Sequence, residues 1–232
     1  MAYFGCCHDR APWSGFSAVT RRGCVDRSVY NLAVDRSVCQ TVSMKISSSP
    51  GANASARERI LYTATRLFYE QGIRATGIDR IIAESNVAKA SFYRQFPAKE
   101  ELVQAVLNHR HEAWMAWFEG SLTARSARGT PSLALIADVL DEWFTEPEFR
   151  GCAFINALAE GSVSVVVAEI ARAHKEVLAE YLRGYITKLG HRAPKQTAQI
   201  VLMIIEGAIV RAQMTGDGAG QAAVARALLK AI

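Results

Sequence analysis

Apolar residues recur at helical spacing almost without interruption from Ser55 to the C-terminus, and this periodicity restricts the fold more than any other feature of the chain. Glycine and proline divide the periodic sequence into segments. No convincing alternation of apolar and polar residues, as in a half-buried strand, interrupts them. The chain has 232 residues, half of them hydrophobic, so it can bury a substantial core. The sequence therefore predicts an all-α protein.

Capping signals and helix breakers set the limits of about nine predicted helices. Ser55 and Glu58 have the S-x-x-E spacing of a capping box, and Gly72 ends the helix that follows. Thr76 and Asp79 form a second signal, T-x-x-D, at the start of a short helix. The helices after the first are predicted at residues 76–85, 88–95, 99–122, 132–146, 148–160, 164–189, 194–215 and 219–231. Gly120, Gly129 and Pro131 mark the end of the fourth helix and the connector after it.

The first 43 residues differ from the rest, because they contain no lysine, no glutamate and no sustained helical period. We expect them to be disordered or not translated, with Met44 as an alternative start, and we expect the disordered extension to reach residue 54. A basic arm that reaches DNA is the alternative. Four of the five cysteines lie in this segment: Cys6, Cys7, Cys24 and Cys39. The number of cysteines is odd, which does not favour a disulfide framework. There is no C-x-x-C pair, and His8 is the single nearby histidine, so a metal site is not favoured either.

The expected cellular location of the protein follows from its apolar stretches and its N-terminus. The longest apolar stretches, such as residues 165–167 and 200–205, are far shorter than the ~20 residues of a membrane-spanning helix. The N-terminus lacks the charged start and apolar run of a secretory signal. We therefore expect a cytoplasmic protein without a membrane partner. The net charge of +5 is too small to identify a nucleic-acid binder by itself.

Residues 77–96 have the layout of a helix-turn-helix, two short helices joined by a turn of three to four residues. A recognition helix needs small residues for close approach and hydrogen-bond donors for phosphates and base edges. Phe92 and Phe96, four residues apart, would anchor the helix to the core. Ala90 would allow close approach and suit a thymine methyl group. The remaining polar side chains project elsewhere: Lys89, Ser91, Tyr93 and Arg94.

The run ATRLFYEQGIRATGIDRIIAESNVAKASFYRQFPAKEELVQAVL resembles the N-terminal DNA-binding domain of the tetracycline-repressor (TetR/AcrR) family. The resemblance spans about Ser55 to Trp114, since helix, turn, aromatic pair and Lys-Glu-Glu-Leu follow in order. It implies a DNA-binding domain at 55–114 and a helical effector-binding and dimerisation domain at 115–232. It also implies a homodimeric, ligand-responsive regulator, usually a repressor, that binds a double-stranded, palindromic DNA operator.

The resemblance also implies roles for single residues. Thr76 and Gly77 would meet phosphate at the start of the second helix. The groove would be occupied by Lys89, Ala90, Ser91 and Tyr93, beside Arg94, where many relatives have an aromatic or basic residue. Lys99 would hold backbone phosphate at the start of the fourth helix. Taken singly, each of these residues also has an ordinary structural explanation, as a cap, a packed ring or a solvated charge.

Two residues depart from the family pattern. Asn86 replaces the usual glycine of the turn, and asparagine tolerates the left-handed backbone that such a turn needs. Ala98 replaces the serine that often caps the fourth helix, at a cost on the order of 1 kcal/mol.

Aromatic residues gather in the part of the chain expected to bind the effector: Trp114, Trp117, Phe118, Trp143, Phe144, Phe149 and Phe154. Plain core packing explains any one of them, whereas the group suits a pocket for an apolar or aromatic molecule. Candidate polar contacts are Asn156, Glu160, His174 and Glu206. The segment 150–157 resembles a motif of one branch of the family. Its Cys152 is a further candidate, either as a redox or electrophile sensor or as a small buried apolar residue.

Helices 194–215 and 219–231 are rich in small and apolar residues. Paired with a second copy they would form a four-helix dimer interface, which also suits a palindromic operator. Two alternatives remain open. An all-α enzyme would use Cys152 or His174, although the chain has no glycine-rich phosphate loop, H-E-x-x-H or G-x-S-x-G motif. A DNA-associated module without sequence preference would keep only the helix-turn-helix. No cofactor is expected.

Overall fold

The computed structural model of the chain describes residue 51, residues 53–161 and residues 164–232, which all belong to one compact unit. The expectations for residues 1–43, and the cysteines among them, lie outside the described residues. Within that part the chain folds into nine helices and no strand: α1 (Ala56–Gln71), α2 (Ile78–Ser85), α3 (Lys89–Gln95), α4 (Lys99–Arg128), α5 (Ala134–Phe144), α6 (Ala153–Ala159), α7 (Val165–Lys188), α8 (Pro194–Thr215) and α9 (Gly218–Lys230). The predicted all-α fold is confirmed.

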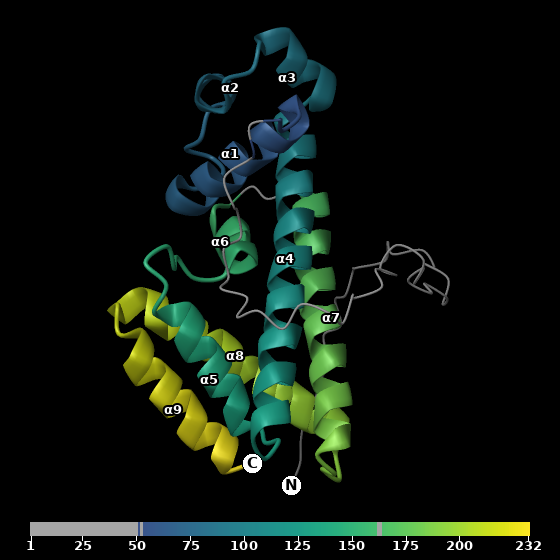
Figure 1. Cartoon of the computed structure of the whole chain (residues 1–232), viewed down its shortest axis with the longest axis vertical. Helices are drawn as coiled ribbons and strands as arrows, with labels where there is room; N and C mark the ends of the chain where they lie inside the picture. The colour runs from purple at the N-terminus through teal and green to yellow at the C-terminus, as the bar shows by residue number, and fades with distance from the viewer. Residues whose placement is uncertain (1–50, 52, 162–163) are drawn as a thin grey trace, which may run out of the picture. The chain divides into compact units, whose positions relative to one another are not determined.

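Helices α1, α2 and α3 pack together beside the N-terminal end of α4 (Figure 1). The predicted capping box opens α1, because the Ser55 side chain accepts from the Glu58 N–H and the Glu58 carboxylate accepts from the Ser55 N–H. Gly72 ends α1 with φ 92°, a conformation that favours glycine. The turn after α2 contains Asn86 at φ 51°, so the left-handed backbone expected there is confirmed.

Helix α4 is longer than predicted. It continues through Gly120 to Arg128, 30 residues or about 45 Å. The expected end near Leu122 is therefore too early, because buried residues on both sides of Gly120, including Phe118 and Leu122, hold the helix in place. Gly129, another of the predicted end markers, is the C-cap residue of α4. Trp114, the predicted last residue of the DNA-binding domain, lies inside this unbroken helix. One continuous helix thus connects the three N-terminal helices to the C-terminal ones.

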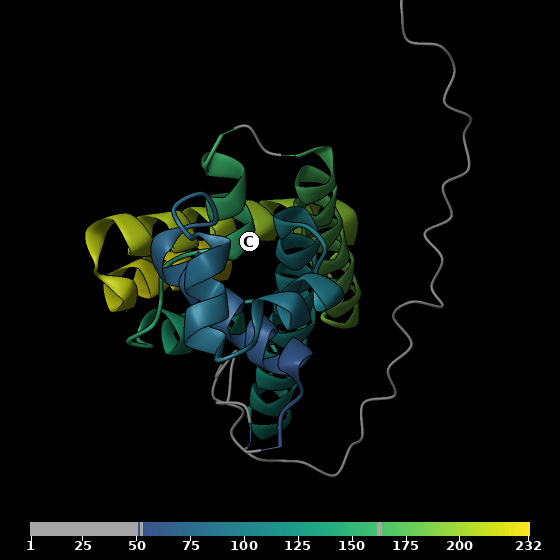
Figure 2. The same cartoon turned by 90° about the horizontal axis from the view of Figure 1, so that it is seen from above.

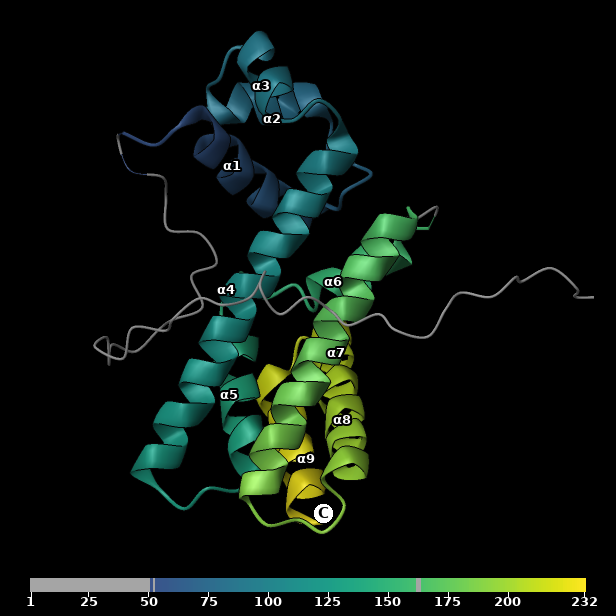
Figure 3. The same cartoon turned by 90° about the vertical axis from the view of Figure 1, so that its right-hand side faces the viewer.

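The C-terminal helices pack around the far part of α4. Helix α8 contacts α7 on one side and α9 on the other, α5 packs against α9, and α7 runs beside α4 (Figure 3). In the view from above, α1–α3 lie in front of these helices (Figure 2). The apolar residues of α8 divide between two environments, with Val201, Ile205 and Ile209 buried and Ile200 and Met203 exposed.

The helix predicted at 148–160 is wrong in its first half. Residues 145–152 form turns and irregular structure, and only Ala153–Ala159 is helical. Gly151 has φ 80°, which a helix does not allow. The Tyr69 hydroxyl holds this loop by donating to the Gly151 carbonyl at 2.8 Å and accepting from the Arg150 N–H at 2.8 Å. The loop is thereby tied to α1.

One helix of the described part, α8, is long and apolar enough to cross a membrane by length and composition, which the short apolar runs in the sequence did not suggest. Its most apolar stretch has a mean hydropathy of 1.3, and 44% of that stretch is buried in the fold. Core helices of water-soluble proteins meet the same test, so this helix is weak evidence for a membrane span.

Candidate functional site

Helix α3 has one buried and one exposed side. Phe92 and Phe96 are buried and pack with their ring centroids 6.4 Å apart. The Arg57 guanidinium lies over the Phe96 ring at 4.5 Å. These contacts bind α3 to α1, and α3 lies at the end of the described helices that the first three helices form (Figure 1). The aromatic pair has the anchoring role predicted for it.

The other side of α3 presents the side chains that the sequence selected for DNA. Lys89, Ala90, Tyr93 and Arg94 are exposed, and Ser91 is partly exposed. Lys89 forms an ion pair with Asp79 of α2 at 3.3 Å, and the two side chains are 67% and 88% exposed. Such an exposed pair is weak and breaks easily when a phosphate competes for the ammonium. Tyr93 is 41% exposed, and its ring meets the edge of Phe92.

Thr76 does not have the surface role predicted for it. It is fully buried, and its hydroxyl donates to the Gly72 carbonyl at 2.7 Å instead of capping α2. The expectation that its side chain caps α2 is wrong, and burial keeps this side chain from reaching phosphate. Gly77 is the N-cap residue of α2 and is exposed. Thr76 turns inward for a local reason, because its hydroxyl supplies the internal hydrogen bond that closes the turn of the loop after α1.

Lys99 is partly exposed at the first turn of α4, with its ammonium 6.0 Å from the centre of the Phe68 ring. Burial lowers the pKa of Lys99, and Glu160 opposes the shift. Ala98 is the N-cap residue of α4 and gives no side-chain hydrogen bond, as predicted from the missing serine. The N–H groups of this helix end are therefore left without a side-chain acceptor from the cap.

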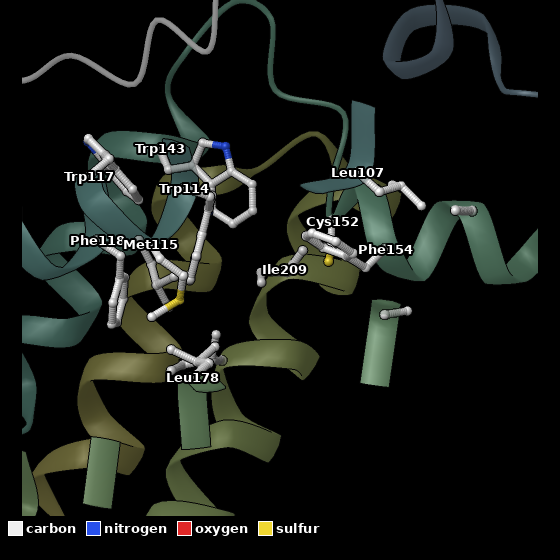
Figure 4. Packing of buried hydrophobic residues seen from close by; sticks show 14 of the residues in the cluster. Leu107, Trp114, Met115, Trp117, Phe118, Trp143, Cys152, Phe154, Leu178 and Ile209 are labelled. Carbon is white, nitrogen blue, oxygen red and sulfur yellow. The ribbon is translucent and has the colours of Figure 1, made fainter. Parts of the chain in front are cut away.

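The aromatic residues expected to line an effector pocket form a packed core instead (Figure 4). Trp114 stacks on Phe118 with centroids 4.9 Å apart and meets Trp143 edge to face at 5.7 Å. Phe144 is also buried. The space enclosed among Trp114, Trp143, Phe154 and their neighbours is about 10 Å³, roughly enough for one water molecule. The expected pocket at this place is closed in this conformation, because the rings fill it.

His174 lies inside the same core. Its ring stacks on Phe154 at 3.9 Å, and its Nδ1 is 2.9 Å from Nδ1 of His111. Burial lowers the pKa of His174 to about 2, and Lys175 and His111 act in the same direction. Burial lowers the pKa of His111 as well. This pair is therefore neutral at physiological pH.

Cys152 is buried at the N-cap of α6, and its Sγ lies 3.7 Å from Nζ of Lys175. Lys175 also pairs with Glu206 at 3.1 Å, so the two predicted polar candidates Cys152 and Glu206 share one lysine. Reactive cysteines are partly exposed, and Cys152 is 5% exposed. Burial thus opposes the sensor interpretation of this thiol.

A larger cavity, about 240 Å³, lies between α1, α4, α6 and the end of α8, and we call it the junction cavity. It is lined by residues that include Thr65, Tyr69, Val106, Arg110, Asn156, Glu160 and Gln213. Asn156 and Glu160 were predicted as effector contacts, whereas Arg110 and Tyr69 were not. Arg110 reads in the sequence as one more charge of a long helix, and only the packing of α1 on α4 buries it.

Glu160 ties the end of α6 to the loop that leads into α2. Its two carboxylate oxygens accept from the N–H groups of Ile73, at 2.8 Å, and Arg74, at 2.7 Å. The Arg74 guanidinium donates to the Glu160 carbonyl at 2.9 Å. The end of helix α6 is thus joined to the loop before α2 by three hydrogen bonds. A displacement of α6 would therefore move the loop that leads into α2.

Within the described ranges, no group of three or more histidine, cysteine, aspartate or glutamate side chains could hold a metal ion.

Comparisons with known proteins agree with this geometry. Residues 60–106 match the model of the family described as "Bacterial regulatory proteins, tetR family". An uncharacterized HTH-type transcriptional regulator of Bacillus subtilis, YxaF, is 49% identical over 57 residues, which cover 24% of this chain and 30% of that protein. The HTH-type transcriptional regulator LmrA of Bacillus subtilis is 27% identical over 161 residues, 67% of this chain and 85% of that protein. The match thus spans less than two thirds of YxaF and most of LmrA.

Two solved structures extend the likeness beyond the first helices. SCO4454, a TetR-family transcriptional regulator from Streptomyces coelicolor, superposes with a TM-score of 0.66 at 28% identity, over 76% of this chain and 93% of that one. The reduced form of NemR from E. coli superposes with a TM-score of 0.67 at 20% identity, over 76% and 97% of the two chains. At that identity the second likeness concerns the fold alone.

Proposed function

The chain belongs to the TetR family of bacterial transcriptional regulators, and we propose that it is a sequence-specific repressor that binds a palindromic operator as a homodimer and leaves it when a small molecule binds. The observation that carries the proposal is the exposed side of α3. Lys89, Tyr93 and Arg94 point into solvent from a helix held by two buried phenylalanines. Such a helix suits the major groove, where donors read base edges and phosphates.

The proposed DNA contacts are Gly77 at the start of α2, the exposed residues of α3 with Ser91, and Lys99. Lys89, Arg94 and Lys99 supply positive charge for phosphate. Ala90 offers the short side chain that close approach to a base requires. Thr76 is left out of this set, since its buried hydroxyl already donates within the loop.

The proposed dimer forms through α8 and α9. Apolar side chains remain exposed on these two helices, among them Ile200, Met203, Met214, Val224 and Leu228. A large apolar surface on a water-soluble chain is a feature of interfaces. Two copies related by a two-fold axis would pair the helices as a four-helix interface and present two α3 helices to one operator.

The proposed effector response is a shift between two populations. Effector must bind the DNA-incompetent conformation more tightly than the competent one, because only this difference in affinity releases DNA. The hydrogen bonds from Glu160 to Ile73 and Arg74 offer a route from α6 to the helix-turn-helix. The proposal includes a cytoplasmic location and no catalytic role, since the family consists of regulators.

The test is fluorescence anisotropy of the full chain on labelled DNA from upstream of its own gene, with scrambled DNA as competitor, over a salt series. We expect tight, sequence-selective and salt-sensitive binding. Lys89→Ala and Tyr93→Ala are each expected to weaken operator binding by about 1–3 kcal/mol, because each removes a groove contact.

The matched control is Lys188→Ala, which removes an exposed cation at the far end of α7. It should leave operator affinity unchanged. Unchanged affinity in both α3 variants, with folding intact, would overturn the residue assignment. Equal affinity for operator and scrambled DNA would favour the module without sequence preference.

A further inference from the structure

Arg110 is a buried cation without an anionic partner. It lies in the middle of α4 with 4% of its surface exposed, and no carboxylate in the described part of the chain forms an ion pair with it. Its guanidinium stacks on the Tyr69 ring at 3.6 Å, and its Nη2 has no hydrogen-bond partner there. A buried charge destabilises the folded protein unless it is paired and hydrogen-bonded. This arrangement is therefore costly to the free protein.

A second residue that lines the same cavity also has a polar atom without a partner. Thr65 on α1 is 3% exposed, and its hydroxyl has no hydrogen-bond partner in the described structure. Thr65 and Arg110 both line the junction cavity. Buried polar groups are nearly always hydrogen-bonded, so two exceptions among the residues that line one cavity point to a place where a polar ligand group can bind.

The other walls of the cavity restrict the rest of the ligand. Phe68, Val106 and Leu107 contribute apolar surface. The volume of about 240 Å³ lies below the roughly 300–1,000 Å³ of sites for drug-sized ligands. The cavity therefore suits a small ligand with an apolar body and one polar end.

Two carboxylates also line the cavity, and both are engaged. Glu70 pairs with Arg66 at 3.2 Å. Glu160 accepts from the N–H groups of Ile73 and Arg74. Their negative charges are thus partly compensated, whereas the charge of Arg110 is not.

We infer that the junction cavity binds a small carboxylic acid with an apolar body, whose carboxylate pairs with Arg110 and accepts from the Thr65 hydroxyl. A planar carboxylate matches the guanidinium fork and can accept two parallel hydrogen bonds. The inference rests on the proposed function only for its consequence, the release of DNA. Because α1 and α6 both line the cavity, an occupant touches the DNA-binding helices and the C-terminal part at once.

The experiment measures binding to the full chain by isothermal titration calorimetry, without DNA. The probes are benzoate and hexanoate, their neutral counterparts benzamide and hexanamide, and inorganic phosphate as an anion without an apolar body. We expect the two acids to bind about 10- to 100-fold more tightly than their amides, as a charge-assisted pair requires. Phosphate is expected not to bind at comparable concentration.

Variants test the two named contacts. Arg110→Met should abolish the preference for acid over amide, and it should remain folded because an apolar side chain replaces an unpaired buried charge. Thr65→Val, which removes only the hydroxyl, should weaken acid binding by about fivefold. Arg125→Met removes a cation from the same helix outside the cavity and should bind the acids as the unchanged protein does. Thermal melting by circular dichroism checks the fold of each variant.

Equal affinity for acids and amides, unchanged acid binding in folded Arg110→Met, or no binding of either acid would overturn the inference. Operator binding is measured separately. Operator binding without acid binding would support the proposed function and overturn the inference. Acid binding without operator binding would support the inference and contradict the proposed function.

Discussion

At the scale of the residue, several polar side chains are buried by neighbours far away in the sequence. His174, on α7, lies among Phe154 of α6, Trp114 and His111 of α4. Arg110 lies under Tyr69 of α1. Each is polar by type, and each is in the core because three or four helices meet there. Burial shifts the pKa of such a group, so its protonation changes over a different pH range from that of an exposed residue of the same type.

The first prediction concerns acid stability. The pKa of His174 is lowered by burial from 6.5 to about 2, so below about pH 6.5 the unfolded chain binds a proton that the folded chain does not. This contribution to stability is complete above pH 6.5 and is lost as pH falls toward 2, by at most about 1.4 kcal/mol per pH unit. Denaturant unfolding from neutral pH to about pH 5 should show this loss.

His174→Phe keeps an aromatic ring in the stack and removes the titration. The variant should lose stability less steeply on acidification than the unchanged protein, while the two show the same slope above neutral pH. Identical slopes in the acid range would contradict a neutral, buried His174.

At the scale of the element, the loop between α5 and α6 depends on one glycine. Gly151 has φ 80°, and a Cβ there would meet the Gln213 side chain of α8. The loop is held from the other side by Tyr69 of α1, and Asn156 donates to the Arg150 carbonyl at 2.7 Å. The loop therefore joins three elements, and its backbone must keep this one conformation.

We predict that Gly151→Ala lowers the free energy of unfolding by about 1–3 kcal/mol, because an L-residue at positive φ is strained. Gly184→Ala is the matched control, since Gly184 lies inside α7 with open space around its Cβ position. That change should be neutral or should stabilise by up to about 1 kcal/mol. Urea denaturation measures both variants. Equal effects of the two substitutions would show that the conformation of Gly151 is not required.

At the scale of the whole molecule, the C-terminal helices have apolar residues on two faces, one buried in the fold and one exposed. Val201, Ile205 and Leu229 pack within the subunit, while Met203 and Val224 remain exposed on α8 and α9. The apolar residues along each helix thus pack in the core on one face and, in our proposal, against a second copy of the chain on the other. Hydrophobic periodicity in the sequence does not distinguish these two uses.

The dimer proposal predicts opposite results for two equally exposed residues. Met203, 72% exposed on α8, should become buried in the dimer, and Val165, 74% exposed at the start of α7, should not. Met203→Glu should therefore weaken dimerisation on the order of a hundredfold, because it buries an unpaired charge. Val165→Glu should leave it unchanged. Analytical ultracentrifugation over a concentration series decides, and dissociation of the Val165→Glu variant, or of neither, would contradict the proposed interface.

The sequence by itself determined most of the helices and the buried aromatic side of α3. Periodicity, the capping box at Ser55, the left-handed Asn86 and the aromatic pair of α3 act over a few residues, so they are visible along the chain. It did not determine the end of α4 or the start of α6. Gly120 is accommodated because the residues on both sides of it are buried against other helices. The segment 145–152 is not helical, and Tyr69 of α1 holds its Arg150 and Gly151 by hydrogen bonds.

Only the tertiary structure decided the interior of the C-terminal part. The sequence correctly grouped its aromatic residues, but whether they enclose space or fill it depends on how rings from α4, α5 and α6 meet, and here they fill it. The junction cavity lies instead where α1 and α6 face α4, and its Arg110 and Thr65 became candidates only through burial. Burial is a property of contacts between distant segments, and a local pattern carries no information about which polar atom will lose its partner.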